Sequence, residues 1–238
     1  MSTPSAEEIL SAASSGDIDP LRTYLSSSPL VLPPNITLED ILTEAARSDQ
    51  ARAVSILLQH GAKVTDAVQE AAHQGSTREV YSLLIPYGLD VNRGFGHAGG
   101  PLTEAVLAGD LEWVKLLLDN GADTELAPLY GNQAALAVAA ANSVDMAIVK
   151  LLMKHGARAN YKGLLPLAVK AGNVPFVQFI LDQGADVNEK VEESFFLPGK
   201  KGSVLRLALE LGNIEIEKIL LDYGADSPVR GGEGGTAF

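Results

Sequence analysis

A short phrase that recurs along the chain constrains its fold more than any other sequence feature. The phrase has two adjacent aliphatic residues, a few further residues and a glycine, as in LLQHGAKV, LLLDNGADT and ILDQGADV. Repetition at a spacing of roughly 20–50 residues is typical of repeat proteins, in which every unit buries its apolar face against the next one. The glycines of the six copies lie 27, 33, 35, 28 and 40 residues apart, at Gly61, Gly88, Gly121, Gly156, Gly184 and Gly224.

A second phrase precedes the closing glycines, as in LTEAVLAGD, LPLAVKAGN and LRLALELGN. In these three copies its own glycine, at Gly109, Gly172 or Gly212, lies 12 residues before the closing glycine. Both phrases carry apolar residues at helical spacing, and glycine readily takes the left-handed conformation that ends a helix. The sequence therefore predicts pairs of short helices near residues 6–28, 38–60, 66–87, 101–120, 133–155, 164–183 and 203–223.

Together the two phrases resemble the repeats of the ankyrin family over roughly residues 5 to 226. The resemblance implies an all-α fold, an ankyrin-repeat solenoid of stacked antiparallel helix pairs with projecting β-hairpin-like fingers between them. The family's TPLH signature is not intact here, and its nearest forms are GGPLTEA and GLLPLAV. Other caps must therefore begin the helices, such as Ser5 with Glu8, which have the spacing of a capping box.

Both ends of the chain have features of capping repeats, which need polar residues on the face that has no neighbour. Glu217 stands where other repeats carry a valine, at Val54, Val114, Val149 and Val177. We therefore expect a single, self-contained ankyrin-repeat domain over residues 1–228, whose first and last helix pairs are caps. The glycine-rich residues 229–238 are expected to form a flexible tail.

The charge and the composition disfavour several classes of partner. The net charge of −12 would repel nucleic-acid phosphates and anionic membrane surfaces, and it favours a basic or neutral protein partner. The chain has no cysteine, which excludes disulfides and thiolate metal sites. Neither a signal peptide nor a membrane span is predicted. We expect a monomer in the cytoplasm or the nucleus.

The sequence lacks the common motifs for chemistry. It contains no GxxxxGK[ST] phosphate loop, no G-x-S-x-G serine, and no two histidines at a metal-ligand spacing. Glu192 and Glu193 are adjacent carboxylates, but nothing in a solvated finger would tune their pKa for acid–base work. We therefore predict no catalytic residue, no metal site and no cofactor.

The resemblance implies a binding surface on the concave side, where the fingers and the exposed faces of the first helices meet. Five aromatic residues lie in predicted fingers, and aromatic side chains are favoured interface anchors. The longest finger, EKVEESFFLPGKKGS, also carries cations beside its two phenylalanines. The contacts expected in and directly after the fingers are Phe95, His97, Tyr130, Tyr161, Phe195, Phe196, Lys200, Lys201 and Arg206. Those expected on the first helices are Arg47, His73, Leu107, Asn142 and Lys170.

These residues favour a non-catalytic protein–protein interaction module that binds a partner in the concave groove. One alternative is a pocket for a small molecule built from the aromatic fingers, or an atypical enzyme that uses His73, His97 and the Glu192–Glu193 pair. Another is a dedicated chaperone or inhibitor of one basic protein, which the acidic charge suggests. For Phe195 and Phe196, packing on the last repeat is the alternative to contact with a partner.

Overall fold

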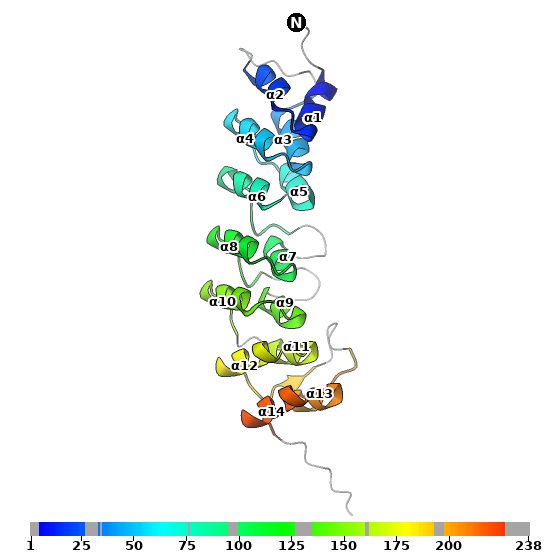
Figure 1. Cartoon of the computed structure of the whole chain (residues 1–238), viewed down its shortest axis with the longest axis vertical. Helices are drawn as coiled ribbons and strands as arrows, with labels where there is room; N and C mark the ends of the chain where they lie inside the picture. The colour runs from blue at the N-terminus through cyan, green and yellow to red at the C-terminus, as the bar shows by residue number, and fades with distance from the viewer. Residues whose placement is uncertain are drawn as a thin grey trace, which may run out of the picture. The chain divides into compact units, whose positions relative to one another are not determined.

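The computed structural model describes residues 5–26, 33, 35–75, 77–94, 100–126, 135–159, 162–192 and 198–226. The chain divides into two compact units, Met1–Gly96 (unit 1) and His97–Phe238 (unit 2). Each unit is built from pairs of short helices, in which we call the earlier member the first helix and the later member the second helix (Figure 1).

Unit 1 contains three of the predicted helix pairs. Its first helices contact one another in chain order, and so do its second helices (Figure 1). The first helices are α1 (Ala6–Ser15), α3 (Leu38–Arg47) and α5 (Asp66–Gly75). The second helices are α2 (Ile18–Leu25), α4 (Ala51–Gln59) and α6 (Arg78–Leu84), the last continued by the 3₁₀ turn η1 (Ile85–Tyr87).

Unit 2 contains the other four predicted pairs, with its first helices again in contact in chain order. The first helices are α7 (Pro101–Leu107), α9 (Ala135–Asn142), α11 (Leu164–Ala171) and α13 (Val204–Leu211). The second helices are α8 (Leu111–Asp119), α10 (Met146–Lys154), α12 (Val174–Asp182) and α14 (Ile214–Asp222). A short antiparallel hairpin of β1 (Lys190–Val191) and β2 (Gly202–Ser203) forms the base of the longest finger. The prediction of an all-α fold built from stacked helix pairs is confirmed.

The core of each unit comes from the same positions of every repeat. The residue four places before each closing glycine is fully buried in all six copies: Leu57, Leu84, Leu117, Leu152, Ile180 and Leu220. On the first helices an alanine four residues before the left-handed end is buried where neighbouring helices approach, at Ala12, Ala45, Ala105, Ala139, Ala168 and Ala208. Because one helix pair cannot enclose these side chains alone, burial requires the adjacent pair.

The ends of the helices follow local sequence signals. Ser5 and Glu8 form the expected capping box, with the Ser5 amide donating to Glu8 Oε2 over 2.7 Å and the Glu8 amide donating to Ser5 Oγ over 3.2 Å. The first helices end at left-handed glycines with φ between 67° and 73°, at Gly16, Gly109, Gly172 and Gly212. Asp49 (φ 57°) and Ser143 (φ 51°) take this conformation without being glycine. Left-handed backbone is costly for residues with a side chain, so the repeat geometry imposes it there.

Each finger is tied to the preceding repeat by a side chain, on a first helix or in the preceding finger, that accepts a backbone hydrogen bond. The amide two residues after a closing glycine donates to a side chain of the preceding repeat: Lys63 to Glu39 Oε1 (3.2 Å), Asp90 to Gln69 Oε1 (3.0 Å), Arg158 to Glu125 Oε1 (3.2 Å) and Asp226 to Asn188 Oδ1 (2.8 Å). These bonds satisfy backbone groups outside the helices and fix where each finger leaves the stack.

Glu189 and Glu192 lie three residues apart in one finger but have opposite environments. The Glu189 carboxylate accepts a hydrogen bond from the Gly163 amide, and its burial raises its pKa above the usual range. Glu192 is exposed and pairs with Lys162, whose Nζ lies 2.8 Å from Glu192 Oε1, and this hydrogen bond and charge lower the pKa of Glu192. The two carboxylates therefore affect stability in opposite directions as pH changes.

The end of unit 2 departs from the valine pattern. Val54, Val114, Val149 and Val177 are fully buried, whereas Glu217 at the same repeat position is half-buried. The single domain over residues 1–228, its capping repeats and the flexible tail over residues 229–238 stay predictions.

We predict that Gly75→Ala destabilises the protein. A Cβ atom at Gly75 would lie 2.2 Å from the carbonyl oxygen of Arg47 on α3, which is backbone and cannot move aside alone. The resulting displacement of α5 from α3 should lower the free energy of unfolding by about 1–3 kcal/mol, despite the better helix propensity of alanine. Denaturant unfolding measures the change. Gln74→Ala, at the exposed neighbouring residue, is the control and should change it by less than about 0.5 kcal/mol.

We predict that Glu189→Gln changes the pH dependence of stability. The folded-state pKa of Glu189 is raised, so the wild-type protein loses stability as pH rises above the ordinary glutamate pKa and through the raised value. Glutamine keeps an acceptor for the Gly163 amide without the charge. The variant should therefore match the wild type at pH 3.5 or so and exceed it at pH 7 in denaturant unfolding.

Glu192→Gln is the matched control for this prediction. Its pKa is lowered, so the wild-type carboxylate stabilises the fold above the ordinary pKa, and this contribution disappears as pH falls. The Glu192 variant should be no more stable than the wild type at neutral pH. Equal pH profiles for the two variants would contradict the assignment of opposite environments.

Candidate functional site

The first helices expose the side chains that precede their left-handed ends. Arg47, Leu107, Asn142 and Lys170 are exposed, and His73 is half-buried. These are the first-helix residues that the sequence places on the binding surface, and all of them are accessible. Their role in binding stays a prediction, because accessibility alone does not identify a binding residue.

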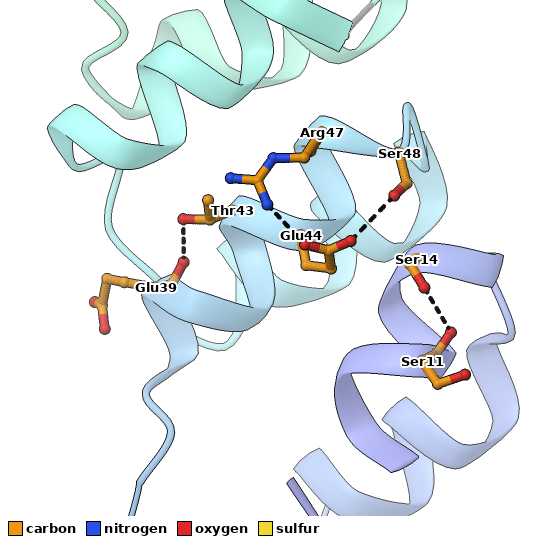
Figure 2. A network of polar contacts seen from close by, with 7 residues as sticks. All are labelled: Ser11, Ser14, Glu39, Thr43, Glu44, Arg47 and Ser48. Carbon is orange, nitrogen blue, oxygen red and sulfur yellow. Dashed lines mark hydrogen bonds and ion pairs between the residues drawn. The ribbon is translucent and has the colours of Figure 1, made fainter. Parts of the chain in front are cut away.

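In unit 1 this surface is polar. Figure 2 shows Glu44, Arg47 and Ser48 near the end of α3, with Arg47 Nη1 3.0 Å from Glu44 Oε2 and Ser48 Oγ donating to Glu44 Oε1 over 3.5 Å. Ser14 on α1 donates to the Ser11 carbonyl oxygen over 3.1 Å. The Arg47 side chain is 55% exposed, so its ion pair with Glu44 orients the guanidinium while leaving much of it accessible.

In unit 2 the equivalent ends of the first helices carry large apolar side chains. Leu107 at the end of α7 is 57% exposed, and Leu211 at the end of α13 is 44% exposed. Asn142 on α9 and Lys170 on α11 occupy the corresponding ends of the helices between them. The Asn142 amide donates to the Val138 carbonyl oxygen over 2.8 Å, so its side chain is held against its own helix. We call these four residues the first-helix surface of unit 2.

The predicted cation cluster lies beside this surface, and it is partly neutralised. Glu210 on α13 forms ion pairs with both Lys200 and Arg206. Lys200 Nζ lies 3.0 Å from Glu210 Oε2, and Arg206 Nε lies 2.9 Å from Glu210 Oε1. These hydrogen bonds and charges lower the pKa of Glu210. Lys200 and Arg206 are thus brought together as expected, but around a carboxylate rather than as an open positive site.

Lys201 lines a depression at the base of the longest finger. The depression has a volume of about 650 Å³ and opens widely to the surface. Both strands of the hairpin and the residue after the last helix pair contribute to it. Its lining residues are Asn188, Lys190, Val191, Glu192, Lys201, Gly202, Ser203 and Asp226. It combines two ammonium groups with two carboxylates, so its charge is balanced.

Six of the predicted contact residues lie outside the described residues: Phe95, His97, Tyr130, Tyr161, Phe195 and Phe196. The binding role of the finger aromatics therefore stays a prediction. The sequence interpretation also missed the partners of the cations, Glu44 and Glu210. Helical spacing carried the signal, because Glu44 precedes Arg47 by three residues and Glu210 follows Arg206 by four.

Within the described residues, no three His, Asp or Glu side chains are grouped so that they could hold a metal ion. In the described parts of the chain, no helix has the length and apolar character needed to cross a bilayer.

Comparison with known proteins supports the repeat assignment. A family model described as ankyrin repeats (3 copies) matches residues 42–127 and 102–191, which together make up more than half of the chain. An ankyrin repeat protein of Acanthamoeba polyphaga mimivirus is 35% identical over 117 residues, covering 48% of this chain and 34% of the viral protein. The match thus spans about a third of that relative's length.

A solved structure, the human ASB11 ankyrin repeat domain, is 21% identical, with 94% of this chain and 85% of that chain covered at a TM-score of 0.48. This similarity is too weak to support conclusions about function. The match of the family model across more than half of the sequence, together with the helix pairs described above, shows that the chain belongs to the ankyrin repeat family.

Proposed function

We propose that this protein binds another protein through the exposed faces of its first helices, with Leu107 and Leu211 as apolar anchors. Ankyrin repeats are generally protein–protein interaction modules. The proposal places the contact on the first-helix surface of unit 2 and on the fingers beside it.

The exposure of these two leucines is the observation that carries the proposal. Leu107 and Leu211 are 57% and 44% exposed, whereas Leu102 and Val106 on α7 and Leu205 on α13 are buried. Fully burying a leucine side chain contributes about 1.5–3 kcal/mol, and in most interfaces a few residues supply most of the binding energy. Two large apolar side chains at corresponding ends of two first helices therefore favour a partner with apolar side chains of its own.

The charges near this surface suggest how a partner would be oriented. Lys170 and the group formed by Lys200, Arg206 and Glu210 provide cations there. Exposed acids lie on the second helices, at Glu112, Asp119, Glu215 and Asp222. The net charge of −12 would then act mainly through long-range attraction of the partner rather than through direct contact. A basic partner stays a prediction drawn from that charge.

The finger aromatics extend the proposed surface. Phe95, Tyr130, Tyr161, Phe195 and Phe196 are proposed as further anchors on the basis of the sequence, since aromatic side chains are enriched in the energetic centres of interfaces. A non-catalytic role is the function that these residues favour.

The test is affinity capture from an extract of the source cells with purified wild-type protein and a Leu107→Ser/Leu211→Ser variant. We expect the double variant to reduce the amount of captured partner at least about tenfold, because two apolar anchors are lost. Its thermal midpoint should shift by no more than about 3 °C, because both side chains are exposed.

The control is Leu111→Ser/Ile214→Ser. Leu111 and Ile214 are the first residues of α8 and α14 and are 37% and 66% exposed, so they match the anchors in type and exposure but lie on second helices. Capture by this control should equal that by the wild type. Equal loss in both double variants, or full retention by the Leu107/Leu211 variant, would show that the first-helix surface is not the binding site.

A further inference from the structure

The last first helix exposes a position that other first helices bury. Three residues before the left-handed end, earlier repeats carry a fully buried small or β-branched residue, at Ala13, Ala46, Val106, Ala140 and Val169. In α13 this position is Leu209, which is 42% exposed. Leu209 is thus a large, exposed apolar side chain at a repeat position where the other first helices have a buried residue.

The last second helix shows the same departure. Three residues before the closing glycine, Leu58, Leu118 and Leu181 are 4–5% exposed and Ile85 and Met153 are half-buried, whereas Leu221 is 42% exposed. Seven residues before that glycine, buried valines of other repeats are replaced by the half-buried Glu217. We call Leu209, Glu217 and Leu221 the end face of unit 2.

The internal repeats indicate what covers such a face. Within unit 2 each first helix contacts the next along the chain, α7 with α9, α9 with α11, and α11 with α13. Second helices contact one another as well, α8 with α10 and α12 with α14. Where another helix pair follows, the positions equivalent to Leu209 are buried, and those equivalent to Leu221 are buried or, at Met153, half-buried. A further helix pair is therefore the shape that fits the end face.

The finger that carries the β1–β2 hairpin has a depression that could hold the loop preceding a further helix pair. The 650 Å³ depression at the base of the hairpin is bounded by Asp226, four residues after the end of α14, and by Asn188, whose Oδ1 accepts from the Asp226 amide. Lys190, Glu192 and Lys201 give it charges of both signs. A polar loop preceding an incoming helix pair would meet donors and acceptors there.

Glu217 restricts which helix pair can occupy the end face. Covering a half-buried carboxylate without a partner is costly, whereas a cation opposite it offsets that cost. A helix pair that resembles the internal repeats need not carry a cation at this place. It would then leave the Glu217 carboxylate covered without a partner, and its docking would be disfavoured. A second copy of this chain, placed about a two-fold axis, would bring Glu217 to both sides of one interface, and like charges there are unfavourable.

We propose that the end face docks a helix pair of a partner protein, stacked as the next repeat would be, with a lysine or arginine opposite Glu217. This interaction is separate from the first-helix surface and does not depend on it. The apolar contacts of Leu209 and Leu221 would supply the attraction, and Glu217 would select the partner.

The absence of cysteine from the chain allows a direct test. Leu221→Cys places one thiol on the end face, and its rate of modification by a soluble disulfide reagent reports coverage. The probe is a second copy of residues 189–226 inserted after Asp226, so that a helix pair is held beside the end face of the full chain. Circular dichroism verifies that the extended chain gains helix.

With Glu217→Gln in the original repeat, the inserted pair should slow thiol modification at least about tenfold, because the end face is then covered without a buried charge. With Glu217 retained, the slowing should be about threefold or less, since the inserted copy was not selected to present a cation. A thiol at Leu126, which is 43% exposed on another finger, should react at the same rate in every version.

Three results would overturn the proposal. The first is an inserted pair that leaves the rate unchanged in the Glu217→Gln background, with Leu209→Cys as a second reporter giving the same answer. The second is a thiol already protected in the unextended chain and released by deletion of residues 227–238, which would assign the face to the chain's own end. The third is protection that grows with protein concentration, which would assign it to a second copy.

Discussion

The burial of apolar residues between consecutive helix pairs is the interaction on which the rest of this structure depends. Leu117 and Leu152 illustrate it, since each is fully buried in a helix of only nine residues. Helices of this length are marginal by themselves in water, and an isolated pair leaves one apolar face exposed. The repeat spacing of the sequence is therefore a requirement for folding as well as a family signature.

This constraint also determines which residues remain available for binding. Positions that face the neighbouring pair must be small or apolar, and small residues such as Ala46 and Ala168 let the first helices approach closely. The ends of the first helices and the fingers carry no such requirement. That freedom accounts for the spacing of 27 to 40 residues between closing glycines, because insertions fall between the helix pairs. It also allows unit 1 to present Glu44 and Arg47 where unit 2 presents Leu107.

The parts of the fold that depend on local sequence could be predicted. The helix pairs follow from apolar spacing and glycines, and the Ser5–Glu8 capping box follows from a spacing of three residues. Features set by neighbouring repeats could not be predicted. Asp49 takes a left-handed conformation and accepts hydrogen bonds from both the amide and the hydroxyl of Thr77, 28 residues away. Likewise, the ion pair between Lys200 and Glu210 forms only when the hairpin folds back on α13, and no local sequence pattern specifies that fold.

Hydrogen exchange of the isolated protein within unit 2 tests the dependence on neighbouring pairs most directly. If contact between pairs supplies most of the stability, the amides of the α11–α12 pair, whose first helix contacts both α9 and α13, should exchange at least about tenfold more slowly than those of α13 and α14. The slowest amides should include those of Ala168 and Ile180, both fully buried. Equal protection of α13–α14 and α11–α12 would show that each pair is stable without a neighbour and would contradict this account.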